Sequence, residues 1–398
     1  MVGGAALRSG LRIAMGSWVE TLRFGRVPGL GRIAATTRDD QMSVARVLIV
    51  DDSAFMRVTL TRLLSEDPEL QVVGTARDGI DALEKVEALR PDVITLDVEM
   101  PRMDGLEFLR QLMATRPTPV VMLSSLTQEG ADTTVEALAL GAVDFAGKPQ
   151  RLTTIHQISD DLLVKVKRAA RARVMPSMMS RRAMVAEPGP TAISPVRAGA
   201  RGAWQTILVI GSSTGGPRAL RQVLSGLPAD LPTPVLIVQH MPPGFTRSLA
   251  ANLDQCSPLR VREAADGDAL ERSLALVAPG GYHMVPTREG VIRLDQGPTV
   301  NGVRPSVDVT LLGTVAVYGS RVLAVVLTGM GHDGLDGAMA LKRAGGVVLA
   351  EHESTCVVYG MPRSIVEAGL ADEVAPIDQM ADAILRRLGV LTATESKA

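Results

Sequence analysis

Short apolar runs alternate with amphipathic stretches over the first half of the chain. Five runs rich in Val, Ile and Leu lie in RVLIVDDS, QVVGTARDG, DVITLDVEMP, PVVMLSS and AVDFAGKP. Between them, around residues 60–64, 83–89, 108–113 and 135–140, apolar residues recur at helical spacing. Repeated strand–helix units of this kind predict an α/β domain over residues 44–163, built on a doubly wound, five-stranded parallel sheet.

A second series of apolar runs begins at residue 204 and continues to about residue 391. Predicted strands lie in TILVIGSS, PVLIVQHM, LALVAPGGYHM, RVLAVVLTGMG and GVVLAEH, with helical stretches between most of them. This pattern predicts a second, parallel-rich α/β domain. In such sheets ligand sites lie at the carboxyl ends of the strands, so polar residues at those ends are the first candidates for chemistry.

Three further segments lack the strand–helix pattern. Residues 164–203 are rich in Arg, Met, Ala, Pro and Gly, which predicts a linker that is helical at its start and flexible afterwards. Residues 1–43 form an N-terminal extension without a signal-peptide-like apolar run. We interpret it as a mis-called start with Met42 as the initiator, and a targeting or docking arm is the alternative. Residues 392–398 form a short tail.

Composition narrows the class of protein. The 42 basic and 43 acidic residues leave a formal charge of -1, which gives no overall attraction to nucleic acid or membrane surfaces. No apolar run reaches the ~20 residues that a spanning helix needs. Cys256 and Cys356 have neither metal-ligand spacing nor a disulfide framework, which is typical of a reducing cytoplasm. We therefore expect a cytoplasmic protein without nucleic-acid binding or membrane insertion.

Acidic residues gather at the predicted carboxyl edge of the first sheet. Asp51 and Asp52 end the first strand, and Asp97 ends the third. Three carboxylates at one edge repel one another unless a cation compensates, and oxygen ligands favour a hard divalent ion, so we expect Mg²⁺ there. Ser124 ends the fourth strand and Lys148 follows the fifth, which brings both to the same edge.

This set of side chains is suited to phosphoryl transfer. A carboxylate oxygen of Asp97 can attack a phosphoryl group while the metal neutralises the developing charge. Lys148 can then pair with the phosphate, and Ser124 can hydrogen-bond to it. The alternative is that the Asp-Asp-Ser sequence merely caps the following helix, which does not account for the full set.

The segments VLIVDDSAFMR, DVITLDVEMPRMDG, VVMLSS and DFAGKP resemble the receiver domain of response regulators, over roughly residues 44–163. The resemblance implies a two-component pathway with a histidine kinase as phosphodonor. It implies that Asp97 is the phosphoacceptor and that Asp51 and Asp52 are metal ligands with it. It also implies that Ser124 and Phe145 form the switch pair that reports phosphorylation, with ordinary core filling as the alternative for Phe145.

The second domain offers a nucleophile. The turn GSSTGG at residues 211–216 follows a buried strand and precedes a helix, which is the setting of a G-x-S-x-G nucleophile. Ser213 would stand exposed at the helix N-terminus, where N–H groups, including that of Thr214, can stabilise an oxyanion. Glycine-rich turns also bind phosphates, although neither G-x-G-x-x-G nor the Walker lysine is present. The turn alone leaves anion binding and catalysis open.

A base and an acid decide between these two interpretations. His240 ends the strand predicted next to that of Ser213, which makes it the best candidate to accept the Ser213 proton. Asp333, after another buried strand, can orient the imidazole. Weaker rivals for these two roles are His283, His332, Asp308 and Asp336.

Six segments of the second domain resemble the chemotaxis protein-glutamate methylesterase (CheB) family: IGSSTGGPRAL, VQHMPPGFTRSLA, APGGYHM, RPSVDV, VVLTGMGHDG and CVVYGMPR. The likeness extends from residue 206 to about residue 374. It implies a triad of Ser213, His240 and Asp333, with no metal in the esterase site. It also implies oxyanion support from backbone groups near Thr214 and Met330. His332 departs from the family pattern, in which many members carry Asn.

The expected function is that of a phosphorylation-activated hydrolase acting on methyl-accepting chemotaxis receptors. Ser213 attacks the γ-carbonyl of a glutamate methyl ester with His240 as base, methanol leaves, and water hydrolyses the acyl-enzyme. The resemblance adds deamidation of certain receptor glutamines. We expect the unphosphorylated receiver to cover the Ser213 site and phosphorylation of Asp97 to release it.

Two other classes of function are alternatives to this one. A DNA-binding response regulator is disfavoured because the second half of the chain lacks a helix-turn-helix pattern. A phosphorylation-controlled scaffold with an inactive esterase domain would require a disrupted triad, whereas Ser213, His240 and Asp333 are all present.

Overall fold

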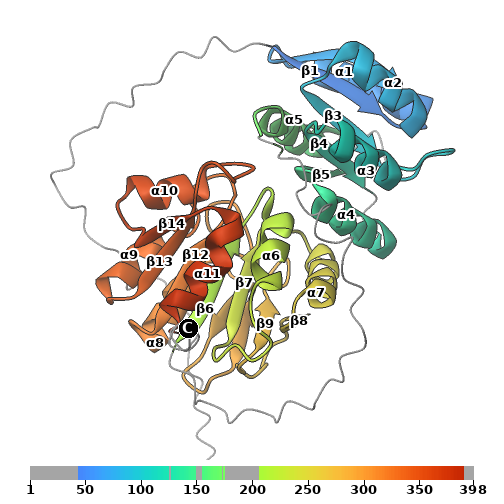
Figure 1. Ribbon diagram of the computed structural model, residues 1–398. Coiled ribbons are helices and arrows are strands. Elements are labelled where there is room, and N and C mark those ends of the chain that lie inside the picture. Colours follow the sequence, from blue (N-terminus) through green and yellow to red (C-terminus); the bar gives the residue numbers. More distant parts are fainter. Residues whose placement is uncertain (1–43, 125–126, 149–154, 173, 175–205, 390–398) are drawn as a thin grey trace, which may run out of the picture. The chain divides into compact units, whose positions relative to one another are not determined.

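The computed structural model describes residues 44–124, 127–148, 155–172, 174 and 206–389 (Figure 1). The N-terminal extension with Met42, most of the predicted linker and the C-terminal tail lie outside these residues, so the predictions for them stay untested. The described chain forms two α/β portions, residues 44–174 and residues 206–389. No helix of these two portions is long and apolar enough to cross a membrane.

The first portion contains a five-stranded, all-parallel sheet with the strand order β2-β1-β3-β4-β5. The strands are β1 (Ala45–Val50), β2 (Leu70–Ala76), β3 (Val93–Asp97), β4 (Val120–Ser124) and β5 (Asp144–Gly147). The helices are α1 (Ala54–Ser65), α2 (Gly79–Leu89), α3 (Gly105–Thr115), α4 (Gln128–Leu140) and α5 (Ile155–Ala170). The predicted doubly wound sheet is confirmed. Helix α5 continues past residue 163, so the start of the predicted linker is helical.

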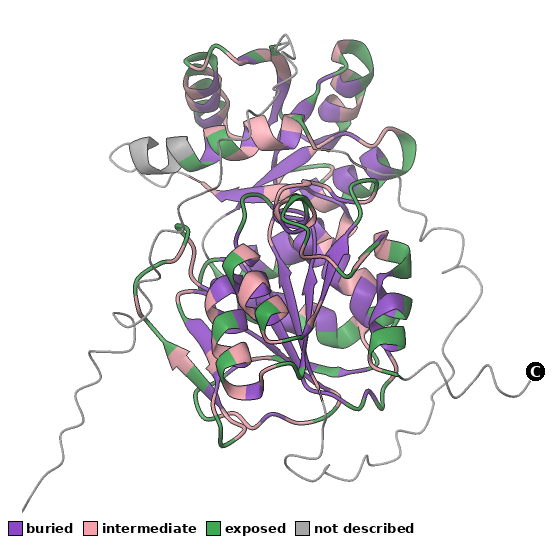
Figure 2. Cartoon of the chain, turned by 90° about the vertical axis from the view of Figure 1, so that its left-hand side faces the viewer, coloured by how far each residue is buried: buried purple, intermediate pink, exposed green. Residues whose placement is uncertain are grey.

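Local sequence explains where these helices begin. The side chains of Ser53, Asp78 and Asp104 accept backbone N–H groups of the first turns of α1, α2 and α3, which leave such donors unpaired otherwise. Strands β3 and β4 are buried along their whole length, as a parallel sheet with helices on both faces requires. Figure 2 shows the buried residues concentrated in the strands.

The second portion contains a seven-stranded, all-parallel sheet with the order β14-β13-β12-β6-β7-β9-β8. Its strands are β6 (Ile207–Ser212), β7 (Val235–Gln239), β8 (Arg260–Glu263), β9 (Leu274–Val277), β12 (Val322–Val326), β13 (Val347–Glu351) and β14 (Glu373–Ala375). A separate antiparallel pair consists of β10 (His283–Pro286) and β11 (Ile292–Asp295). The prediction of a parallel-rich second sheet is confirmed.

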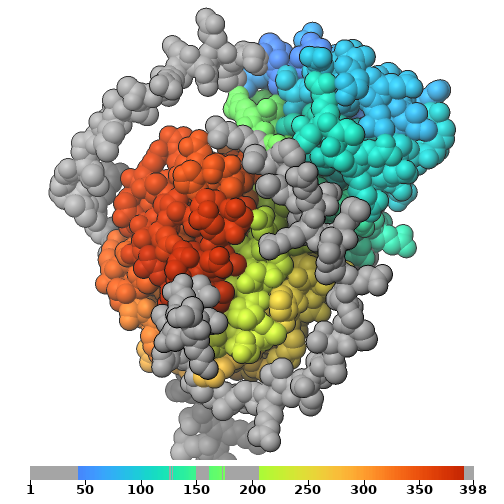
Figure 3. Space-filling view, in the orientation of Figure 1, coloured from blue at the N-terminus to red at the C-terminus, as the bar shows by residue number. Residues whose placement is uncertain are grey.

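Six helices belong to this second portion. They are α6 (Gly216–Ser225), α7 (Phe245–Cys256), α8 (Val307–Tyr318), α9 (Leu335–Arg343), α10 (Met361–Glu367) and α11 (Ile377–Arg387). Helix α11 packs beside α6, and their atoms form a continuous surface in the space-filling view (Figure 3). The helices thereby exclude water from the apolar strands between them.

The central strand β6 lies between β12 and β7, which places three strand ends side by side. In the register of the sheet, Ser212 is opposite Gln239, and Gly211 is opposite Val326. The loops that follow β6, β7 and β12 therefore meet at one edge, the location at which parallel sheets hold their ligands.

Candidate functional site

The acidic side chains predicted at the edge of the first sheet lie together. One carboxylate oxygen from each of Asp51, Asp52 and Asp97 lies within 4.8 Å of the others. The Lys148 Nζ atom is 2.5 Å from Asp97 Oδ2 and 3.5 Å from Asp51 Oδ2. Asp51 and Asp97 are buried, whereas Asp52 is exposed. Hard carboxylate donors converging on a point that is open to solvent on one side fit a divalent cation such as Mg²⁺.

Burial has the largest effect on the pKa values of the two buried carboxyl groups in this cluster. Burial raises the pKa of Asp97 to about 6, although the hydrogen bond and the charge of Lys148 act in the opposite direction. The pKa of Asp51 is raised for the same reason. Lys148 by itself therefore does not balance the buried negative charge, and a divalent cation would favour full ionisation.

The two predicted switch residues have different surroundings. The Ser124 hydroxyl donates to the Gly130 carbonyl at 3.0 Å and accepts from Thr134 Oγ1 at 2.7 Å. The Phe145 ring is buried and stacks on Phe245 of α7, with the ring centroids 4.4 Å apart. Phe145 therefore does not only fill the core beside its own sheet, because its ring also contacts a helix of the second portion.

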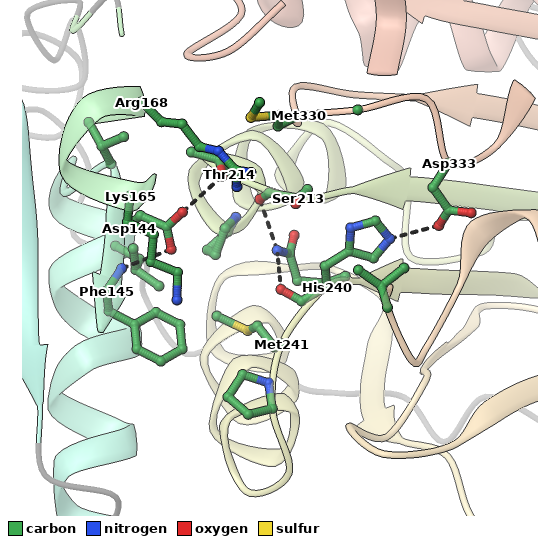
Figure 4. Close-up of a pocket in the computed structure, with 18 of the residues that line it drawn as sticks. Asp144, Phe145, Lys165, Arg168, Ser213, Thr214, His240, Met241, Met330 and Asp333 are labelled. Carbon is green, nitrogen blue, oxygen red and sulfur yellow. Dashed lines mark hydrogen bonds and ion pairs between the residues drawn. The ribbon is translucent and has the colours of Figure 1, made fainter. Parts of the chain in front are cut away.

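Ser213 lies in the turn between β6 and α6, as the sequence predicts. Its backbone N–H donates to the Thr328 carbonyl at 3.0 Å, which fastens the turn to the residues that follow β12. Gly215 has a φ of +80°, and a Cβ atom there would lie 2.6 Å from Val357 Cβ, so this position requires glycine. The Ser213 side chain is partly exposed and lines a cavity of about 480 Å³ (Figure 4).

His240 and Asp333 form a hydrogen-bonded pair beside Ser213. The distance from His240 Nε2 to Asp333 Oδ2 is 2.7 Å, and in Figure 4 the imidazole lies between Asp333 and Ser213. This leaves Nδ1 as the ring nitrogen that can serve Ser213. Among the described residues no hydrogen bond joins the Ser213 hydroxyl to the imidazole, although both side chains line the same cavity.

Asp333 is held as a carboxylate. It is 3% exposed, and its Oδ1 accepts the Ser306 hydroxyl at 2.7 Å. In the first turn of α8, the backbone N–H of Val307 donates to Asp333 Oδ2 at 2.6 Å and that of Asp308 donates to Oδ1 at 3.2 Å. Burial acts to raise the pKa of Asp333, but the hydrogen bond and charge of His240, with the donors from α8, lower it to about 2. Such a carboxylate can orient the imidazole and stabilise its protonated form.

The backbone N–H groups of Thr214 and Met330 are candidates for binding an oxyanion. Neither donates to a backbone acceptor within the described residues, and both residues line the cavity with Ser213. At Gly329, next to Met330, a Cβ atom would lie 2.7 Å from Ser213 Cβ. The absence of a side chain at Gly329 thus allows the loop after β12 to approach Ser213 closely.

The four rival residues occupy other positions. His283 is buried in β10, where its Nε2 lies 3.0 Å from a backbone carbonyl, and His332 is exposed at the cavity. Asp308 accepts hydrogen bonds from the N-terminus of α9 and from Asn301. Asp336 is exposed in the first turn of α9. Among the described carboxylates, Asp333 is the one that contacts the His240 ring.

Two buried polar residues support the turn that holds Ser213 and were not predicted. The Gln239 amide donates to the Ser213 carbonyl at 2.9 Å, and its oxygen accepts the Ser212 hydroxyl at 2.7 Å. Glu351 accepts the Thr328 N–H at 2.8 Å, and burial raises the pKa of this carboxyl to about 7. Each of the two ends a strand that is otherwise apolar, which is a visible signal, but their partners lie far away in the sequence.

Residues of the first portion line the same cavity. The Thr214 hydroxyl donates to Asp144 Oδ2, at the start of β5, at 2.9 Å. Asp144, Lys165 and Arg168 line the cavity together with Ser213 (Figure 4). Side chains of the first portion therefore lie next to the turn that holds Ser213.

Comparison with known proteins gives concordant matches. The family model of the response regulator receiver domain matches residues 47–160, and that of CheB methylesterase matches residues 208–384. A protein-glutamate methylesterase/protein-glutamine glutaminase of Symbiobacterium thermophilum is 55% identical over 353 residues, covering 86% of this chain and 97% of that protein. Its namesake in Pyrococcus horikoshii is 44% identical, covering 87% and 94%. The crystal structure of the Thermotoga maritima CheB methylesterase catalytic domain, 45% identical, covers 47% of this chain and 98% of that one with a TM-score of 0.45.

Proposed function

Because the chain belongs to the protein-glutamate methylesterase/protein-glutamine glutaminase family, we propose that it demethylates glutamate side chains of chemoreceptors under the control of phosphorylation. The observation that carries the catalytic part is the 2.7 Å pair of His240 and Asp333 beside Ser213. Deamidation of receptor glutamines follows the same acyl-enzyme route, since an amide and an ester present the same carbonyl to the nucleophile.

In the first step, the Ser213 hydroxyl attacks the γ-carbonyl carbon of the substrate. His240 takes the hydroxyl proton through its free ring nitrogen, and Asp333 stabilises the resulting imidazolium. The negative charge on the carbonyl oxygen is stabilised by the N–H groups of Thr214 and Met330. The imidazolium then protonates the leaving methoxide or amide nitrogen, so that methanol or ammonia departs.

In the second step, water hydrolyses the acyl-enzyme. His240 removes a proton from the water as it attacks the same carbon, and the proton returns to Ser213 Oγ when the ester bond breaks. A free glutamate carboxylate is the product of both reactions.

The receiver portion supplies the control. Asp97 would accept a phosphoryl group from a histidine kinase, and Asp51, Asp52 and Asp97 would hold Mg²⁺, which neutralises charge on the phosphoryl oxygens. Lys148, 2.5 Å from Asp97 Oδ2, would pair with the phosphoryl group. Ser124 would hydrogen-bond to it, giving up its present bond to Gly130.

The contacts of Phe145 and Asp144 support a covered resting state. Phe145 stacks on Phe245, and Asp144 accepts a hydrogen bond from Thr214, next to the nucleophile. Phosphorylation would draw Ser124 toward the phosphoryl group and shift Phe145, which weakens the stack and opens the cavity to a receptor.

The experiment is methanol release from methylated receptor by the full chain, with and without a small-molecule phosphodonor and Mg²⁺. Wild type is compared with Ser213→Ala, Asp97→Ala and the control Ser225→Ala, an exposed serine at the end of α6. We expect donor-stimulated release that is lost in Ser213→Ala and that loses only its stimulation in Asp97→Ala. Undiminished release by Ser213→Ala would reject the catalytic assignment, and no release by wild type would favour a scaffold with an inactive esterase domain.

A further inference from the structure

Two helices next to the proposed triad cap each other. A carboxyl group from the segment of each helix accepts backbone N–H groups at the N-terminus of the other. Asp333, just before α9, accepts the N–H groups of Val307 and Asp308 in the first turn of α8. In return, Asp308 Oδ1 accepts the N–H of Gly337 in the first turn of α9 at 2.8 Å. The N-cap residue of α9 is Gly334, which has no side chain to cap its own helix. Asp308 therefore provides the cap that α9 lacks.

The exchange buries two carboxyl groups beside each other. Asp308 is 2% exposed and Asp333 is 3% exposed. The other oxygen of Asp308 accepts the side-chain amide of Asn301 at 3.2 Å. Burial and the charge of Asp333 raise the pKa of Asp308 to about 7, whereas Asp333 is the ionised member of the pair. Asp308 thus gains its negative charge near neutral pH.

We infer that Asp308 is a positioning residue of the triad, which fixes Asp333 against His240 and adjusts how firmly this pair holds the proton taken from Ser213. The inference rests on the proposed catalytic roles of Ser213, His240 and Asp333. Asp308 itself does not contact the imidazole, because Asp333 is the carboxylate that does so. The Asp308 carboxyl group caps α9 just after Asp333 and feels the charge of Asp333, so its effect reaches the base through Asp333.

Among the ionisable groups near Asp308, Asp333 has the strongest electrostatic effect on the pKa of Asp308. Helix α8 packs against α9, β6, β7, β10 and β12, and the strands β6, β7 and β12 contain no ionisable residue. The charge that acts most strongly on Asp308 is that of Asp333. The ionisable groups on the remaining elements and on the loop before α8 are His283, Arg304, Asp336, Lys342 and Arg343.

The charge of Asp308 has a definite consequence for the base. An ionised Asp308 adds a second negative charge near Asp333, which stabilises the imidazolium form of His240. The proton taken from Ser213 is then held more firmly, and the neutral imidazole needed at the start of the reaction forms at higher pH. Asn at position 308 keeps the shape of the side chain and an acceptor for Gly337, but it carries no charge at any pH.

The test is the pH dependence of kcat/KM for methanol release by the full chain with phosphodonor and Mg²⁺. In Asp308→Asn we expect the acid limb to move to lower pH by roughly half a unit or more. We also expect kcat to fall several-fold with little change in KM, because the interaction acts in the transition state. The control Asp336→Asn, the same change at an exposed position of α9, should match wild type. A wild-type profile for Asp308→Asn would overturn the inference and leave Asp308 as a helix cap only.

A second variant covers the case that Asp308→Asn does not fold, as judged by its thermal denaturation. Asn301→Gly removes the amide donor and tolerates the φ of +54° at this position. Without that donor Asp308 keeps its proton to higher pH, so the acid limb should move in the same direction by a smaller amount. An unmoved limb would contradict the inference. Activity that survives in Ser213→Ala would instead reject the proposed function, so the two failures are distinguishable.

Discussion

The side-chain amide of Gln239 donates a hydrogen bond of 2.9 Å to the carbonyl oxygen of Ser213, which joins the end of β7 to the nucleophile turn. The same amide group lies 3.3 Å from the carbonyl of His240, and its oxygen accepts the Ser212 hydroxyl. One buried side chain therefore ties the segment of the proposed base to that of the proposed nucleophile.

Removing this connection is expected to lower turnover. Gln239→Met keeps the length of the side chain but removes one of the two donors to the Ser213 carbonyl, the other being the Gly216 N–H, and leaves the Ser212 hydroxyl unpaired. We therefore expect kcat to fall several-fold with KM nearly unchanged. Steady-state methanol release measures both. Ser212→Ala is the matched control, because it removes only the bond to the Gln239 oxygen and should cost less. Equal losses in the two variants would argue against the connection.

Glu351 is expected to make stability depend on pH. Burial raises the pKa of Glu351 to about 7, above the ordinary value of 4.5, so the folded protein binds its proton more tightly than the unfolded chain. The favourable contribution is complete below pH 4.5 and is lost as the pH rises to about 7. Glu351→Gln should therefore be more stable than wild type at pH 8, by up to about 3 kcal/mol, but not at pH 4.5. Thermal denaturation of both proteins across this pH range measures the difference in stability between them. A difference that does not change with pH would contradict the prediction.

Activity is expected to depend on a hydrogen-bond acceptor at position 351 but not on the negative charge of Glu351. Glu351 accepts the Thr328 N–H, and the Thr328 carbonyl accepts the Ser213 N–H. Glu351→Gln keeps an acceptor and should retain most activity. Glu351→Leu leaves the buried Thr328 N–H unpaired and should lower kcat several-fold at pH 7, in protein that is still folded by circular dichroism. Similar rates for the two variants would show that the nucleophile does not depend on this contact.

The stack of Phe145 on Phe245 is expected to hold the resting state. Phe245→Leu removes the aromatic contact but keeps an apolar side chain, so the unphosphorylated enzyme should release methanol several-fold faster than wild type. The matched control is Phe55→Leu, since Phe55 is exposed on α1, and its rate without phosphodonor should not change. An unchanged rate in Phe245→Leu would mean that the stack does not restrain the site.

Binding of Mg²⁺ to the acidic cluster is expected to weaken with falling pH. The pKa of Asp97 is about 6, so its protonation competes with the metal as the pH falls from 7 to 5. Calorimetric titration should show an affinity loss of about tenfold over this range. Asp97→Asn should bind Mg²⁺ more weakly, with a flatter pH dependence. The same pH dependence in both proteins would assign the competing proton to another group.

Much of the architecture could be predicted from the sequence. The apolar runs around β1, β3, β4, β6, β7 and β12 are largely buried strands, because side chains covered on both faces of a parallel sheet must be apolar. Polar residues that interrupt these runs stand at the strand ends, which is why Asp97, Ser213 and His240 could be selected as candidates. Glycine-rich turns identified the nucleophile loop, since few other residues adopt its backbone conformation.

The partners of these residues were decided only by the tertiary structure. The sequence by itself determined which residues end the strands and favoured Asp333 over the weaker rivals Asp308 and Asp336, but it could not show which carboxylate contacts His240. The strand order β12-β6-β7 and the packing of α8 against α9 bring Asp333 to His240. The hydrogen bonds of Gln239 and Glu351 also depend on residues distant in sequence. Burial and hydrogen-bond partners arise when separate strands and helices come together, whereas local patterns of hydrophobic and polar residues specify only the elements themselves.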